Sequence, residues 1–291
     1  MTTSPLCSIS RDAGAVDGAV DRLSWLELDD DPATVDVVAS GGHLYQRHNT
    51  GRILAYTGTP HTGWLELDDD PSTVQVAADG NAVYQRHDTG AIFAYTGTPH
   101  TGWLQLDDDP ASADIVAAGG HLYQRHSTGR VLVYTGPSTG WLELDDDPST
   151  VQIAADGNAV YQRHDTGAIF AYTGTPHIGW LQLDDDPASA DIVAAGGHLY
   201  QRHSTGRVLV YTGTPHTGWL ELDDDPATVQ IAADGNALYQ RHDTGRVLAY
   251  TGTPATGWIE LDADAATVQV VAGGGRLYQR HDTGRLRAFT G

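Results

Sequence analysis

Short apolar runs alternate with turn residues along almost the whole chain. In one representative stretch the runs are 34–39, 43–48, 52–56 and 64–67, separated by segments rich in Gly, Asn, Asp and Pro. Runs of four to six residues with β-branched and aromatic content, bounded by such residues, predict β-strands. No window shows the 3.6-residue period of an amphipathic helix, so we expect an all-β protein.

This four-strand pattern recurs seven times, and each copy contains one Trp and one Tyr-Gln-Arg-His segment. The tryptophans lie 38 or 39 residues apart, at Trp25, Trp64, Trp103, Trp141, Trp180, Trp219 and Trp258. Seven such units predict a seven-bladed β-propeller with four antiparallel strands per blade. A solenoid is the alternative fold, but it requires atypical capping repeats, and the copies here are nearly uniform from first to last.

The size of the side chains predicts the order of the strands within a blade. The innermost strands converge at the axis and need small residues, as in the Val/Ala run 74–78, whereas Trp-Leu-Glu-Leu suits the outermost strand. The chain then begins with a spare outer strand, and we expect Trp25–Leu28 to complete the last blade and close the ring. Residues 25–291 would form the propeller, and residues 1–24 a flexible tail.

Charge and composition exclude several classes of partner. The chain has 38 acidic and 16 basic residues, a net charge of −22, so we expect no binding to nucleic acid or to anionic lipid surfaces. No apolar stretch approaches the ~20 residues that span a bilayer. The first residues lack the pattern of a signal peptide, which predicts a cytoplasmic location unless the chain is exported within a longer one or by a non-classical route. Its single cysteine, Cys7, excludes an internal disulfide and a cysteine-based zinc site.

The phrases LYQRHDTGRVLAYTGTP and GWLELDDDP resemble the repeats of tachylectin-like bacterial propeller modules, and the resemblance covers residues 25–291. This family includes lectins that hold sugars in grooves between adjacent blades. The resemblance therefore implies carbohydrate binding at such grooves, without assigning individual contacts.

Two connections of each blade lie at the same end of the predicted strand order: the turn after the first strand and the loop after the third. Sugar sites combine aromatic rings with planar polar groups in a largely preformed groove, and these connections carry His, Asn and Trp. The alternative interpretation is that the aromatic residues belong to the core and that the His and Asn serve turn geometry. The candidate carbohydrate-binding residues are His61, Trp64, Asn81, His100, Trp103, His121, Asn158, His177, Trp180, His198, His216, Trp219 and Asn236.

Two charged motifs have structural interpretations. A buried Arg needs a partner, so we predict seven Arg–Asp bridges between the Asp-rich turns and Arg47, Arg86, Arg125, Arg163, Arg202, Arg241 and Arg280. The Asp triplets, such as 68–70, could begin a calcium site but lack the spaced ligands of known calcium loops. We interpret them as turns with side-chain-to-backbone hydrogen bonds and expect no metal or cofactor.

The recurrence of the same chemical groups in most copies also limits the possible functions. An active site needs a unique constellation, whereas the His and Asp groups recur in most copies, so we expect no enzyme. The favoured hypothesis is a multivalent carbohydrate-binding propeller for neutral or cationic glycans, because several weak equivalent sites gain avidity. The alternative is a protein–protein interaction scaffold that binds no glycan. A closed propeller leaves no strong reason to assemble, so we expect a monomer.

Overall fold

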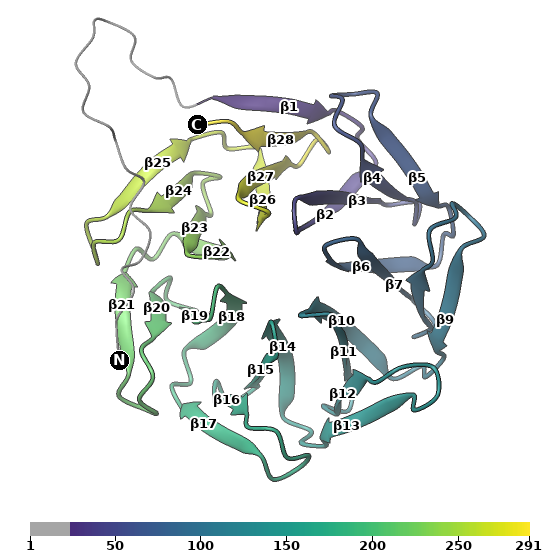
Figure 1. Ribbon diagram of the computed structural model, residues 1–291. Coiled ribbons are helices and arrows are strands. Elements are labelled where there is room, and N and C mark those ends of the chain that lie inside the picture. Colours follow the sequence, from purple (N-terminus) through teal and green to yellow (C-terminus); the bar gives the residue numbers. More distant parts are fainter. Residues whose placement is uncertain (1–23) are drawn as a thin grey trace, which may run out of the picture.

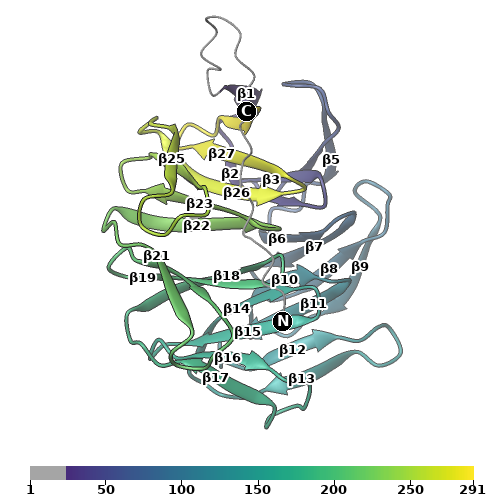
Figure 2. The ribbon, with the colours of Figure 1, turned by 60° about the vertical axis from the view of Figure 1, so that its left-hand side comes forward.

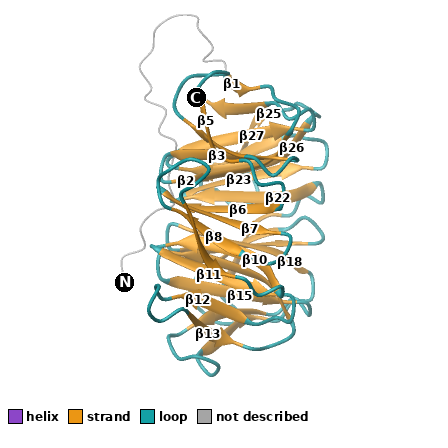
Figure 3. Cartoon of the chain, turned by 90° about the vertical axis from the view of Figure 1, so that its right-hand side faces the viewer, coloured by secondary structure: helices purple, strands orange, loops and turns teal. Residues whose placement is uncertain are grey.

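The computed structural model describes residues 24–291, so the predicted tail, apart from Ser24, lies outside the described residues. The described chain forms seven four-stranded antiparallel sheets arranged as blades around a central axis (Figure 1). Oblique and edge-on views show a disc built of strands and loops (Figures 2 and 3), and no helix occurs between residues 24 and 291. The predicted seven-bladed propeller is confirmed.

The strand order within the blades follows the predicted gradient of side-chain size, with Ala- and Val-rich strands at the axis. The innermost strands are β2 (Thr34–Ser40), β6 (Thr73–Asp79), β10 (Ser112–Ala118), β14 (Thr150–Asp156), β18 (Ser189–Ala195), β22 (Thr228–Asp234) and β26 (Thr267–Gly273). The second strands are β3 (His43–His48), β7 (Ala82–His87), β11 (His121–His126), β15 (Ala159–His164), β19 (His198–His203), β23 (Ala237–His242) and β27 (Arg276–His281).

The two outer positions of each blade are taken by shorter strands that carry the Tyr and Trp residues. The third strands are β4 (Ile53–Tyr56), β8 (Ile92–Tyr95), β12 (Val131–Tyr134), β16 (Ile169–Tyr172), β20 (Val208–Tyr211), β24 (Val247–Tyr250) and β28 (Leu286–Phe289). The outermost strands are β1 (Trp25–Asp29), β5 (Trp64–Asp68), β9 (Trp103–Asp107), β13 (Trp141–Asp145), β17 (Trp180–Asp184), β21 (Trp219–Asp223) and β25 (Trp258–Asp262).

The ring is closed by the two ends of the described chain. Strand β1 pairs antiparallel with β28, so that the last blade has the order β1-β28-β27-β26. Trp25 lies opposite Phe289, with 5.2 Å between the ring centroids, and Leu28 is 2% exposed. The predicted closing strand is therefore confirmed, and it continues one residue further, to Asp29.

The hydrophobic core consists of seven equivalent clusters between neighbouring blades. In one of them Tyr45 and Leu67 of one blade pack with Val76 and Val83 of the next. Leu44, adjacent to Tyr45 in sequence, belongs to the cluster on the opposite side of its blade. This alternation is what a strand covered on both faces requires, since successive side chains point to opposite sides of the sheet.

Buried polar groups also join the blades. The Gln46 amide donates to Asp29 Oδ2 at 2.9 Å, and its oxygen accepts a hydrogen bond from the Thr34 hydroxyl at 2.9 Å. Asp29 belongs to the last blade, whereas Gln46 and Thr34 belong to the first. An equivalent amide-to-carboxylate bond recurs at every joint, so that the buried carboxylates are satisfied rather than left as isolated charges.

Candidate functional site

The outer strands run around the perimeter, and the end of each one meets the start of the next; in Figure 1, β1 points toward the beginning of β5. At this joint the Trp64 indole N–H donates to the Leu28 carbonyl oxygen at 3.3 Å. The Trp64 ring also packs against Tyr56, with 5.0 Å between centroids. The same indole-to-carbonyl bond occurs at all seven joints, so the four candidate tryptophans, Trp64, Trp103, Trp180 and Trp219, tie blades together.

The candidate loop histidines lie at the same joints. The backbone N–H of His61 donates to the Leu28 carbonyl oxygen at 2.7 Å, and His61 has a left-handed backbone with φ of 63°. His100, His177 and His216 adopt the same conformation, as does Ala255 at the equivalent position. A positive φ is uncommon outside glycine. Here the backbone hydrogen bond to the preceding blade stabilises the left-handed conformation, and this conformation fixes the direction of the imidazole.

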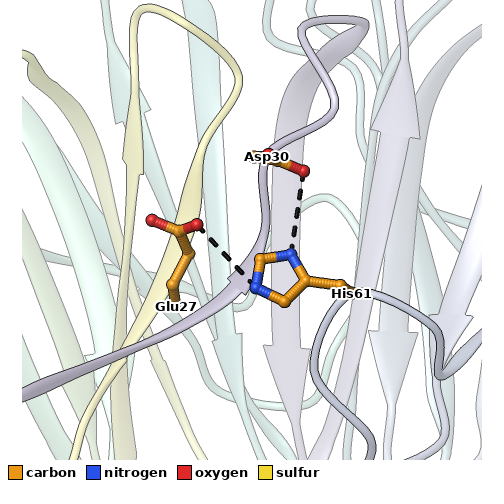
Figure 4. A group of neighbouring side chains, drawn as sticks. All are labelled: Glu27, Asp30 and His61. Atoms are coloured by element: carbon orange, nitrogen blue, oxygen red, sulfur yellow. Dashed lines mark ion pairs between the residues drawn. The ribbon is translucent and has the colours of Figure 1, made fainter.

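Each such imidazole is directed toward acidic side chains of the preceding blade (Figure 4). His61 Nε2 lies 3.8 Å from Glu27 Oε1, and Nδ1 lies 3.7 Å from Asp30 Oδ1. Within one blade the His-bearing loop and the Asp-rich turn lie at opposite ends of the outer strand, as antiparallel pairing requires, but the sequence analysis did not foresee their contact across a joint. Because the outer strands follow the perimeter, the turn after one strand meets the loop before the next.

A complete Glu–Asp–His group forms at three of the joints. Its members are Glu27, Asp30 and His61; Glu66, Asp69 and His100; and Glu143, Asp146 and His177. In each group the second oxygen of the Glu carboxylate is held by the Arg that directly precedes the third strand of its own blade, as with Arg285 Nε at 2.9 Å from Glu27 Oε2. One carboxylate oxygen therefore faces the histidine in a fixed orientation.

Other joints lack at least one member of this group. His216 lies 3.8 Å from Asp185, but Gln182 replaces the Glu and its amide turns to the Asp184 carbonyl oxygen at 3.3 Å. At a further joint Ala255 replaces the histidine. Sequence analysis missed the Glu residues, although the chain carries a signal for them. Blades that have Arg directly before the third strand, as at Arg52, have Glu as the third residue of the outer strand. The two blades with Ala before the third strand, at residues 91 and 168, have Gln there instead.

The remaining candidates lie elsewhere. The last residues of the innermost strands, among them Asp79, Asp156 and Asp234, and the glycines that follow them line a cavity of about 220 Å³ at the centre of the ring. The candidates Asn81, Asn158 and Asn236, in the turns after these strands, and His121 and His198, which begin second strands, therefore lie toward the axis, whereas the loop histidines and tryptophans lie at the perimeter. The structure does not join the predicted residues into one groove, and their role in sugar binding stays a prediction.

The three residues of an Asp triplet have separate tasks. Asp68 is buried and accepts the Gln85 amide at 2.8 Å, Asp69 is exposed beside a loop histidine, and Asp70 accepts the backbone N–H of Ser72 at 2.9 Å. That last bond, which stabilises the carboxylate, lowers the pKa of Asp70. The predicted turn chemistry is confirmed, because the side-chain-to-backbone bond recurs after all six triplets and also after Asp264 in the seventh copy.

The predicted Arg–Asp bridges are wrong. None of the seven arginines of the Tyr-Gln-Arg-His segments lies within ion-pair distance of a carboxylate in residues 24–291. Arg86 Nε instead donates to Gln75 Oε1 at 3.0 Å, and Nη1 donates to the Ser112 carbonyl oxygen of the next blade at 3.3 Å. Where Asp36 replaces the Gln, the buried Nε of Arg47 has no hydrogen-bond partner. Neutral acceptors on the neighbouring strand thus satisfy most of these cations.

Known proteins share the fold but do not identify the chain. No family model matches it, and no curated protein matches it. A structure of YCF48 bound to D1 peptide superimposes with a TM-score of 0.70 at 13% identity, over 94% of this chain and 99% of that chain. YCF48 from Cyanidioschyzon merolae gives 0.65 at 12% identity, over 91% and 98%. Yeast RCC1 (Prp20) bound to Kap60 gives 0.64 at 9% identity, over 88% and 80%.

These identities establish a shared propeller architecture and nothing finer. The resemblance to tachylectin-like repeats is not supported by any family model. Between residues 24 and 291 no helix is long and apolar enough to cross a membrane.

Proposed function

We propose that this protein is a non-catalytic binding propeller that engages proteins or peptides at several equivalent positions on its perimeter. The observation that carries the proposal is an exposed apolar residue repeated at the second position of every outer strand. These residues are between 37% and 52% exposed: Leu26, Leu65, Leu104, Leu142, Leu181, Leu220 and Ile259.

A single exposed leucine is ordinary, but the same position repeated on seven edge strands is a surface. Each outer strand pairs with no strand other than the third strand of its blade, so its other edge is open to a further strand, although the carbonyl of the Leu28-type residue already accepts hydrogen bonds at the joint. An extended peptide can add to such an edge, with backbone hydrogen bonds giving affinity and apolar side chains meeting the leucine. Seven equivalent edges would add avidity toward a partner with repeated segments.

The perimeter geometry favours a peptide over a sugar as the ligand. The indole N–H groups and part of the Trp rings already make contacts at the joints between blades, so they are less available to stack on a sugar or to hydrogen-bond to it. The fold neighbours support the same class, since YCF48 was solved with a peptide and RCC1 with a protein. The net charge of −22 favours partner segments that combine apolar residues with cationic ones.

The test is a selection from a random linear peptide library on the immobilised full chain, with a glycan array run in parallel. We expect apolar, basic peptides that bind at several sites per chain. Binding should be lost when all seven perimeter residues are replaced by Thr, a residue that suits strands.

The matched control is a variant with Thr at four other exposed apolar positions, Val74, Val151, Val229 and Val268, which lie on inner strands. This variant should bind the selected peptides like the original protein. Loss of binding in the valine variant alone would move the surface to the inner strands. Glycan binding without any peptide selection would overturn the proposed function in favour of a lectin.

A further inference from the structure

The Glu–Asp–His groups at the blade joints combine donors that transition metals prefer. In each of the three groups one histidine nitrogen and one oxygen from each carboxylate all lie within 4.8 Å of one another. Zinc is bound by imidazole nitrogen at about 2.0–2.1 Å and by carboxylate oxygen at about 2.0–2.2 Å, which places tetrahedral ligand atoms about 3.4 Å apart. The distance from the histidine Nδ1 to the Asp oxygen, 3.5 Å at Asp69 and at Asp146, already approaches this spacing. The Glu oxygen lies nearer the other ring nitrogen, Nε2, so an ion bound at one nitrogen takes both carboxylates only after the imidazole or one carboxylate turns toward it.

We propose that the chain binds Zn²⁺, or a divalent ion of the same class, at these three joints and at no other blade joint. Each ion would take His61, His100 or His177 together with the Glu and Asp of the preceding blade, and water would complete the coordination. The proposal does not depend on the identity of the protein's partner.

The donor set selects the class of ion. Calcium and magnesium take oxygen ligands, whereas imidazole together with carboxylate suits zinc and its neighbours in the first transition row. The two carboxylates offset the charge of a divalent ion, and the strongly acidic chain attracts cations. We therefore expect Zn²⁺ to bind and Ca²⁺ not to compete with it.

The surrounding structure prepares the ligands. The loop backbone is anchored to the preceding blade, as with the His61 N–H bond to the Leu28 carbonyl oxygen, and this directs the imidazole toward the carboxylates. The Arg that holds one oxygen of each Glu leaves the other facing the histidine, as Arg285 does for Glu27. Groups that orient metal ligands in this way raise metal affinity.

Because the histidine comes from one blade and the carboxylates from another, a bound ion would cross-link neighbouring blades. In the group of Glu27, Asp30 and His61 it would join the first blade to the last, at the closure of the ring. An ion that binds only the folded chain raises its melting temperature by mass action. Zinc uptake and thermal stabilisation are therefore two readouts of the same sites.

The experiment measures zinc on tag-free full-length protein treated with a chelator and then dialysed against buffered Zn²⁺. We expect three ions per chain by elemental analysis, and a Zn²⁺-dependent rise in melting temperature that excess Ca²⁺ does not reduce. The triple variant His61→Ala/His100→Ala/His177→Ala should bind none and show no rise. Alanine at this position is compatible with the fold, since Ala255 occupies it with φ of 62°.

Two control variants should keep all three ions. His216→Ala should do so because that joint has Gln182 in place of the Glu. Cys7→Ser should also leave three, since its thiol is not a ligand in the proposal. A second variant, Glu27→Gln/Glu66→Gln/Glu143→Gln, introduces the residue that other blades already carry and should abolish uptake.

The proposal is overturned if the original protein takes up no zinc, in which case the groups are ion pairs between blades only. It is equally overturned if the triple histidine variant binds as many ions as the original. The group of Asp262, Asp264 and His281, in which only the histidine is buried, would be the first alternative location. A lower count in His216→Ala would show that the Glu is not needed, which contradicts the proposed ligand set.

Discussion

Ring closure by β1 can be tested with one substitution in that strand. Leu28 is 2% exposed and packs with Val37 and Leu44 of the first blade and with Tyr278 and Leu286 of the last. Leu28→Ala removes these contacts from a cluster that joins the two ends of the described chain. Buried Leu→Ala changes cost about 2–5 kcal/mol, through lost transfer free energy and the cavity that remains.

The repeat supplies matched controls for this experiment. Leu67 occupies the equivalent position within the ring, is 3% exposed, and packs in an equivalent cluster, so Leu67→Ala should cost as much as Leu28→Ala. Leu26 lies on the same strand as Leu28 but is 46% exposed. Leu26→Ala should change the free energy of unfolding by only about 0.5 kcal/mol, as expected for surface substitutions.

The assay is urea unfolding followed by tryptophan fluorescence, with the midpoints of the three variants compared. Because all three substitutions remove the same atoms, differences between midpoints report differences in packing. If Leu28→Ala unfolds at the same urea concentration as Leu26→Ala, strand β1 contributes nothing to the core and the ring is not closed as described. A loss in Leu28→Ala equal to that in Leu67→Ala would support the closure.

Three further predictions concern buried polar groups. Arg86→Ala should lower the free energy of unfolding in urea by about 1–3 kcal/mol, because it leaves an acceptor unpaired. Arg47→Ala should cost less, since the Nε of Arg47 has no partner to lose. Burial raises the pKa of Tyr200 to about 12, and its hydroxyl has no hydrogen-bond partner. Tyr200→Phe should therefore be neutral or stabilising in thermal unfolding, whereas Tyr45→Phe, which loses a bond to a backbone carbonyl, should cost about 1 kcal/mol. Stability should also fall as the pH drops below about 6.5, the pKa of unfolded histidine, because the unfolded chain then binds protons that the folded chain excludes. Melting temperatures between about pH 7.5 and 5 measure this, and a flat profile would refute it. Burial lowers the pKa of the four histidines responsible, His48, His126, His203 and His281.

The candidate site was only partly predictable from the sequence. The positions of the loop histidines and the tryptophans beside the outer strands were predictable, although their role in sugar binding stays a prediction. Their neighbours were not, because the sequence analysis assigned turns to ends of the blades by strand direction alone. The direction of the outer strand around the perimeter brings Asp30 next to His61, and this direction results from sheet twist accumulated across a blade.

The arginine segments illustrate the same limit. Sequence reasoning correctly required a partner for a partly buried Arg, and it chose the most abundant acidic group. The register of neighbouring strands instead places Gln75 opposite Arg86, so an amide oxygen accepts the hydrogen bond. Which acceptor is within reach depends on pairing between strands, and composition does not specify it.

The sequence by itself determined the number of blades, the four strands in each, their order from the axis outward, and the closing strand at Trp25. These features follow from local rules: the spacing of turn residues, the alternation of side chains, and the small residues needed at the axis. Only the tertiary structure decided which side chains meet across the joints, such as Glu27 with His61. Those contacts join residues from different blades, and their distances depend on the twist of every sheet and on the closure of the whole ring.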